Sequence, residues 1–165
     1  MDKLYAPWRN DYVTGTAHKE KKDKLKNDCV FCAAFAKNND EKNFILKRFK
    51  HCIVMLNLYP YNAGHLLVLP IEHKGELKDL SIEIRSELMD VINLSINALT
   101  KVLKPQGFNV GLNLGIAGGG GIPSHLHFHI LPRWNGDTNY LATLGEIKVV
   151  SSDLFKIYKD LRQEF

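Results

Sequence analysis

Three of the seven histidines recur at every second position, in a stretch whose residue types are well suited to chemistry. The stretch is Pro123-Ser124-His125-Leu126-His127-Phe128-His129-Ile130-Leu131-Pro132. An imidazole can attack phosphorus, exchange a proton near neutral pH or bind a metal ion. Because the imidazoles alternate with apolar residues, the stretch predicts a β-strand with the histidines on one face and Leu126, Phe128 and Ile130 on the core face.

The geometry of such a strand excludes one metal ion held by all three imidazoles. A strand rises about 3.3 Å per residue, so His125 and His129 would lie roughly 13 Å apart, whereas zinc binds an imidazole nitrogen at about 2.1 Å. A half-exposed strand that carries histidine by chance is the alternative, but it requires three coincidences on one face. The pattern therefore favours a face that performs chemistry without a three-histidine metal cage.

Four consecutive glycines, Gly118, Gly119, Gly120 and Gly121, stand just before the histidines. Glycine lets backbone N–H groups approach an anion closely because no side chain intervenes. The run therefore predicts a phosphate cradle, with a simple flexible turn as the alternative.

A pair of cysteines, Cys29 and Cys32, is a second group of residues able to bind an ion. Two thiolates at this spacing are half of a tetrahedral zinc site and need two further ligands. With three cysteines in all, the chain fits a reducing compartment better than a secreted disulfide framework. Cys52 lies in an apolar run and is predicted to be core. A reduced, metal-free pair is one alternative; a redox or metal-handling protein is another, but it leaves the histidines unexplained.

Length and charge predict a single domain over residues 1–165, with an N-terminal arm and basic linker (1–28), a core (29–134) and a C-terminal extension (135–165). Much of the formal net charge of +4 lies in residues 18–26, which favours polyanionic small molecules over a dedicated nucleic-acid surface; a solvated loop is the alternative. The sequence shows no apolar run of membrane-spanning length and no signal-peptide layout. We therefore expect a soluble cytoplasmic protein.

The elements that must position these residues follow from apolar periodicity and turn chemistry. Their succession favours an α+β fold, in which an antiparallel sheet of about five strands is backed by one long central helix and a C-terminal helix. Ser81 is the expected cap of the long helix and Pro105 its stop. The predicted elements are strands at 52–58, 65–70, 108–114 and within the histidine stretch, and helices at 81–104 and 152–165.

The run His125-Leu126-His127-Phe128-His129-Ile130-Leu131 matches the pattern His-x-His-x-His followed by two apolar residues. In this respect the chain resembles the histidine-triad (HIT) nucleotide-binding proteins over residues 29–134. The flanks 4–9 and 132–139 resemble the branch of bacterial diadenosine tetraphosphate phosphorylases and hydrolases. The resemblance implies a HIT-like fold and a homodimer that acts on nucleotides.

For activity, the resemblance implies cleavage of a dinucleoside polyphosphate at an α-phosphate through a covalent nucleotidyl-His127. His65 would orient the reacting histidines, and His129 would contact the α-phosphate or position the nucleophile. Phosphorolysis, with inorganic phosphate as acceptor, is favoured because the glycines offer room and donors. Hydrolysis of dinucleoside polyphosphates or nucleoside phosphoramidates by the same histidine, or a non-catalytic nucleotide-binding module, are the alternatives.

Further polar residues are assigned from the family pattern. Asn113 matches an amide near the phosphate, and Asn57 matches the residue that binds the ribose hydroxyls, with turn capping as an equal alternative. Where commoner members carry a Gln and a hydroxyl residue before the triad, this chain has glycines and then Ser124, which would replace the hydroxyl. Arg133 and residues 134–139, from this subunit or its partner, would complete the phosphate pocket.

Zinc-bearing relatives imply the two missing ligands of the cysteine pair, His73 and His125. Cys29, Cys32, His73 and His125 would then form a closed site, and its zinc would be structural because no ligand position stays open. A divalent cation bound with the substrate is a further expectation from the family.

Overall fold

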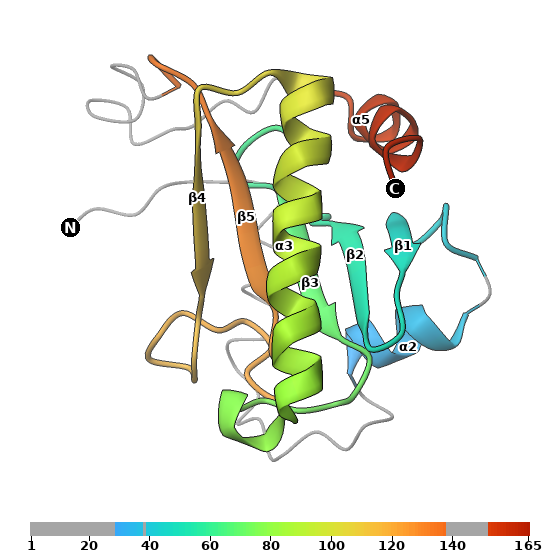
Figure 1. Cartoon of the computed structure of the whole chain (residues 1–165), viewed down its shortest axis with the longest axis vertical. Coiled ribbons are helices and arrows are strands. Elements are labelled where there is room, and N and C mark those ends of the chain that lie inside the picture. The colour runs from blue at the N-terminus through green and yellow to red at the C-terminus, as the bar shows by residue number, and fades with distance from the viewer. Residues whose placement is uncertain (1–28, 38, 138–151) are drawn as a thin grey trace.

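The computed structural model describes residues 29–37, 39–137 and 152–165. Its centre is a five-stranded antiparallel sheet with the strand order β1-β2-β3-β5-β4, and the long helix α3 lies over one face of this sheet (Figure 1). The predicted arm and basic linker, residues 1–28, lie outside the described residues, so the division of the chain into arm, core and extension stays a prediction. The elements are α2 (Val30–Ala36), β1 (Ile45–Arg48), β2 (Cys52–Leu56), β3 (Leu66–Pro70), the 3-10 helix η2 (Leu77–Asp79), α3 (Ile82–Leu103), β4 (Gly107–Leu112), β5 (Phe128–Arg133) and α5 (Leu154–Arg162).

Alternation along β2 and β3 sorts the core into two apolar clusters on opposite faces of the sheet. Both strands are buried along their whole length. Cys52, Val54 and Leu56 pack in the larger cluster with α3 and α5, whereas Ile53 and Met55 pack in the smaller cluster with α2. The predicted α+β fold is therefore confirmed, and the sheet also carries a short helix on its second face.

The predicted helix at 81–104 is confirmed at both ends. The Ser81 side chain caps α3 by accepting a hydrogen bond from the Ile84 N–H at 3.2 Å. Lys104 ends the helix in the left-handed conformation, just before Pro105. No helix in the described ranges is both long and apolar enough to cross a membrane. The buried residues of α3 recur at helical spacing and are Ile84, Leu88, Val91, Ile92, Ser95, Ala98 and Leu99.

The strand predicted over the histidine stretch begins later than the alternation suggests. β5 starts at Phe128, so His125 and His127 lie in the irregular segment before it. The physical reason is that the Leu126 N–H donates to the carbonyl of Lys74 at 2.7 Å instead of extending the ladder with β3. The two faces are as predicted, because Leu126 packs in the larger cluster while the rings of His125 and His127 contact Phe31 of α2 on the other side.

The edge strand β1 was not delimited by the sequence pattern. It has four residues and a register shift against β2 between Ile45 and Lys47, so its alternation is broken. The carbonyl of Ile45 accepts hydrogen bonds from the Tyr158 hydroxyl at 3.1 Å and from Arg162 at 2.6 Å. The C-terminal helix α5, predicted at 152–165, therefore covers and satisfies this edge of the sheet.

Candidate active site

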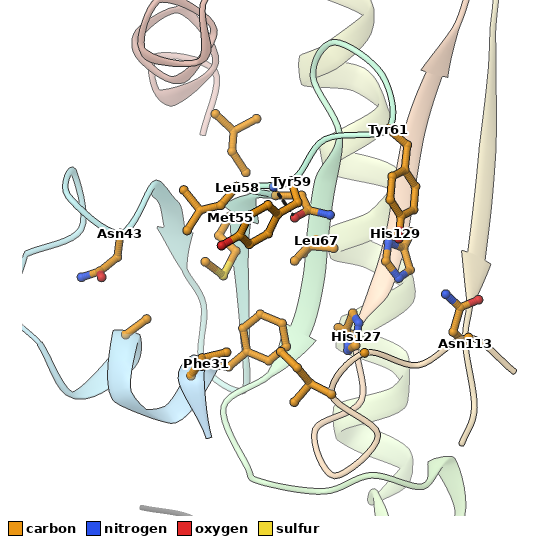
Figure 2. A pocket seen from close by; sticks show the side chains of 17 residues that line it. Phe31, Asn43, Met55, Leu58, Tyr59, Tyr61, Leu67, Asn113, His127 and His129 are labelled. Carbon is orange, nitrogen blue, oxygen red and sulfur yellow. Dashed lines mark hydrogen bonds between the residues drawn. The ribbon is translucent and has the colours of Figure 1, made fainter. Parts of the chain in front are cut away.

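A cavity of about 350 Å³ opens beside the predicted histidines, on the face of the sheet that α2 covers. Segments far apart in the sequence converge on it, and Figure 2 shows Phe31, Tyr61 and Asn113 around His127 and His129. Its lining is largely apolar, with a few polar groups near the imidazoles, which is typical of a small-molecule site. The cavity is lined by Val30, Phe31, Ala34, Asn43, Met55, Leu56, Asn57, Leu58, Tyr59, Tyr61, Leu67, Asn113, Gly119, Gly121, Ile122, His127 and His129.

The tautomer of His127 follows from one hydrogen bond to a backbone carbonyl. Its Nδ1 lies 2.8 Å from the carbonyl oxygen of His125, and because a carbonyl only accepts, Nδ1 carries the proton. The Nε2 atom therefore holds a lone pair. Burial of the ring lowers the pKa of His127, which keeps that lone pair unprotonated. His127 is thus built to attack an electrophile in the cavity.

A chain of hydrogen bonds sets the opposite tautomer on His129. The Tyr61 N–H donates to Nδ1 of His65 at 3.2 Å, so His65 carries its proton on Nε2. That nitrogen lies 2.9 Å from Nδ1 of His129, which must accept and therefore leaves the proton of His129 on Nε2. This buried N–H has no partner among the described residues. His129 can thus donate to a ligand in the cavity beside His127, since the two rings lie 5.0 Å apart.

The same two buried histidines predict a loss of stability in acid. Burial, helped by neighbouring imidazoles, lowers the pKa of His65 to about 3 and that of His129 to about 4, from an ordinary 6.5. The unfolded chain therefore binds more protons below pH 6.5. The free energy of unfolding is expected to keep its full value above pH 6.5 and to fall by on the order of 2 kcal/mol per histidine between pH 7 and pH 5.

Denaturant titrations of wild type and His129→Gln at pH 7 and pH 5 check this expectation. The variant should lose on the order of 1–2 kcal/mol less than wild type over that range. Both proteins keep the two cysteines and their histidine partners, so acid effects there cancel. Equal losses in wild type and His129→Gln would contradict the assigned burial effect.

Of the polar residues predicted to bind the nucleotide, Asn57 and Asn113 lie at the cavity and Ser124 does not. Asn57 lines the cavity, but its Oδ1 accepts from the Tyr59 N–H at 3.0 Å and its Nδ2 lies 3.3 Å from Nδ1 of His65. Turn capping is thus present, and ribose binding stays a prediction. Asn113 also borders the cavity, whereas Ser124 is not among the lining residues.

The glycine run forms a structured turn with fewer available donors than predicted. Gly119 and Gly121 line the cavity, whereas Gly118 and Gly120 are not among the lining residues. The N–H groups of Gly119 and Gly120 donate within the turn, to the carbonyls of Ile116 and Gly115, each at 3.0 Å. Gly119 has a φ of +86°, a conformation that requires glycine. The run therefore shapes the cavity more than it offers N–H groups to phosphate.

Arg133 does not line the cavity of its own subunit, so its predicted role in a phosphate pocket stays a prediction that involves the partner subunit. Its Nε and Nη2 donate to the two carboxylate oxygens of Asp137 at 2.6 and 2.8 Å, and its Nη1 donates to Asn109. The guanidinium holds the pKa of the Asp137 carboxyl well below its usual range. Arg133 is absent from the residues that line the cavity, and residues 138–139 lie outside the described ranges.

The four predicted metal ligands meet beside the cavity. The Sγ of Cys29 lies 3.3 Å from Nδ1 of His125, and the Sγ of Cys32 lies 3.4 and 3.5 Å from Nδ1 of His73 and of His125. Ligand bonds of about 2.3 Å to sulfur and 2.1 Å to nitrogen would separate tetrahedral S and N donors by about 3.6 Å. The Nε2 of His125 donates to the carbonyl of Pro70 at 2.9 Å, which leaves Nδ1 free to ligate. The cluster thus fits a tetrahedral zinc ion.

Two aromatic residues of the site were missed by the sequence reasoning. Phe31 packs on His127 with ring centroids 5.2 Å apart, and Tyr61 stacks on His129 at 6.0 Å with 14° between the planes. Phe31 lies between the two cysteines and Tyr61 in a turn, so neither has a periodic signal. Their proximity to predicted site residues was the only available clue.

Comparison with known proteins agrees with this arrangement. The HIT domain family matches residues 38–136. An AP-4-A phosphorylase from Mycobacterium tuberculosis is 37% identical over 150 residues, covering 91% of this chain and 77% of that protein. An asymmetrical bis(5′-nucleosyl)-tetraphosphatase from Schizosaccharomyces pombe is 31% identical over 93 residues, covering 56% of this chain and 50% of that protein. A crystal structure of a zinc-bound histidine triad family protein from Mycobacterium smegmatis has a TM-score of 0.69 at 25% identity and covers 85% of this chain and 94% of that chain. Because the family match spans more than half of its length, this chain belongs to the HIT domain family.

Proposed function

We propose that this protein is an enzyme that cleaves dinucleoside polyphosphates, diadenosine tetraphosphate among them, at an α-phosphate through a nucleotidyl-His127 intermediate. The observation that carries the proposal is that His127 and His129 have opposite tautomers and border the same cavity. His127 offers a lone pair on Nε2, and His129 offers a buried N–H that no described residue accepts. The names of the M. tuberculosis and S. pombe relatives support the substrate class.

In the first step, Nε2 of His127 forms a bond to the α-phosphorus while the bond from phosphorus to the bridging oxygen breaks. The leaving nucleotide keeps that oxygen and the electron pair. The N–H of His129 donates to an oxygen of the reacting phosphate, in a site where burial strengthens the hydrogen bond. In the second step, an acceptor oxygen attacks the phosphorus, the N–P bond breaks and His127 recovers its lone pair. The acceptor releases its proton to solvent.

We propose phosphate as the acceptor in preference to water. The 37% identity to a protein named AP-4-A phosphorylase supports this choice, whereas the commitment of Arg133 to Asp137 removes one expected donor from this subunit. A divalent cation accompanying the polyphosphate chain belongs to the same proposal.

The products of diadenosine tetraphosphate cleavage test the choice of acceptor. With millimolar inorganic phosphate, ATP and ADP are expected, and label from radioactive phosphate should enter the ADP. Chloride at matched ionic strength is the control and should yield little turnover. If AMP remains the second product and added phosphate does not accelerate the reaction, phosphorolysis is excluded and hydrolysis by the same histidine stands.

We also propose that Cys29, Cys32, His73 and His125 hold a structural zinc ion. The donor distances and the zinc-bound M. smegmatis structure support this proposal. A closed four-ligand site supplies rigidity and no reactive position. Thiolate ligands must stay reduced, which supports the cytoplasm as the location.

A homodimer is the proposed assembly. Among the described strands, β4 pairs only with β5 and leaves its other edge open. Val110 on this strand is 45% exposed, and Leu114 and Ile116 just beyond it are 45% and 74% exposed. Because an open strand edge with apolar neighbours is a ready pairing surface, we expect light scattering to give twice the chain mass. Val110→Asp should shift the protein toward monomer, and a monomeric wild type at micromolar concentration would contradict the assembly.

A further inference from the structure

Helix α2 is too short to hold its position alone. It has seven residues, its N-cap Cys29 makes no side-chain cap hydrogen bond, and it has no acidic residue in the first turn and no basic residue in the last. Isolated helices of this length are unstable in water. The position of α2 therefore depends on what it packs against and on what binds its cysteines.

The two sides of α2 belong to two different sites. Cys29 and Cys32 lie in the cysteine–histidine cluster, whereas Val30, Phe31 and Ala34 form one wall of the cavity. Candidate metal ligands and cavity-lining residues thus follow one another within the first turns of the same short segment. Any rotation or displacement of α2 that separates the cluster must also move the wall.

Phe31 packs its side chain against both sites, beside the hydrogen bond from His127 to the carbonyl of His125. Its ring lies 5.5 Å from the ring of His125, in the cluster, and 5.2 Å from the ring of His127, the proposed nucleophile. Figure 2 shows the Phe31 side chain on the His127 side of α2. Phe35, one turn later, also packs on His125, at 5.7 Å, but it is not among the residues that line the cavity.

We infer that Phe31 is a positioning residue that couples ligand occupancy of the cysteine–histidine cluster to nucleotide affinity in the cavity. Ligation of Cys29 and Cys32 together with His125 fixes α2 against the segment that carries His127. Phe31 is then held where the apolar part of a nucleotide packs. The inference rests on the proposed function in two respects, namely that the cavity takes a nucleotide and that the cysteine–histidine cluster holds zinc.

Coupling of this kind must be reciprocal. If zinc in the cluster raises the affinity for a nucleotide, the nucleotide raises the affinity for zinc by the same factor, commonly about 5–150-fold. Zinc affinity measured by chelator competition, with and without saturating AMP, therefore reports the coupling without any turnover. AMP serves as the probe because it carries one nucleoside and one α-phosphate.

The experiment compares full-length wild type, Phe31→Leu and Phe35→Leu. In zinc-loaded protein, calorimetry should show AMP affinity reduced at least about tenfold by Phe31→Leu and less than about twofold by Phe35→Leu. Saturating AMP should tighten zinc binding at least about fivefold in wild type and Phe35→Leu, but less than about twofold in Phe31→Leu. With dinucleoside polyphosphate, Phe31→Leu should raise KM while kcat stays within about threefold.

Two results would overturn the inference while leaving the proposed function intact. One is AMP binding to wild type that leaves zinc affinity unchanged, and the other is the same coupling in Phe31→Leu as in Phe35→Leu. Failure of the zinc-loaded wild type to bind AMP at all would instead overturn the proposed function, and the inference with it. Zinc content near one per chain in both variants confirms that neither replacement acts by losing the metal.

Discussion

Replacing His127 with alanine is expected to abolish turnover of dinucleoside polyphosphates while nucleotide affinity stays within about tenfold of wild type. The Nε2 lone pair of His127 forms the bond to phosphorus, so its removal takes away the reaction path. Ground-state binding depends mainly on the apolar cavity walls, which the substitution leaves in place. Residual turnover should fall below about one per cent of wild type.

Product assays and nucleotide binding on the same preparation check this expectation. His51→Ala is the matched control, because His51 lies outside the cavity beside Glu83 and should leave turnover unchanged. Rapid quench of wild type in alkaline denaturant should trap a nucleotide on His127 that is missing from the alanine variant, because the N–P bond of such an intermediate survives in alkali. Turnover above about one per cent in the variant would show that the covalent assignment is wrong.

Loss of a metal ligand is expected to have the largest effect on stability. Wild type purified without chelator should hold one zinc per chain, and Cys32→Ser should hold little. Because binding free energy at a structural zinc site is folding free energy, we expect a loss of about 5 kcal/mol. In a domain of this size that corresponds to a fall in Tm of about 10–20 °C.

Elemental analysis and thermal denaturation together decide this prediction. Cys52→Ala is the control, because burial raises the pKa of the Cys52 thiol to about 12 and keeps it protonated in the core. That variant should retain one zinc per chain despite a modest loss of packing. A metal-free wild type as stable as the zinc-loaded protein would rule out a structural role for the cluster.

Local patterns predicted the elements whose signals are contained in a few neighbouring residues. Ser81 and Pro105 bound the long helix because capping and proline geometry act within one turn. The histidine alternation predicted the two faces correctly. The start of β5 was not predictable, because it depends on a hydrogen bond from the Leu126 N–H to the carbonyl of Lys74, which is 52 positions earlier in the chain. β1 was not delimited because it is short and its register shift breaks the pattern.

By itself, the sequence determined the residue types and the periodicity, and with them the histidine face and the cysteine pair. The resemblance to the HIT proteins then implied the nucleophile candidate, His127, and the two histidine ligands, His73 and His125. Only the tertiary structure decided which hydrogen bonds and ring contacts these residues make with one another. The proton positions on His127 and His129 depend on the carbonyl of His125 and on the path from Tyr61 through His65. The ion pair of Arg133 with Asp137 likewise could not be predicted from the sequence pattern. Hydrogen bonds and ring contacts between distant segments have no local periodicity, so they become visible only when the chain is folded.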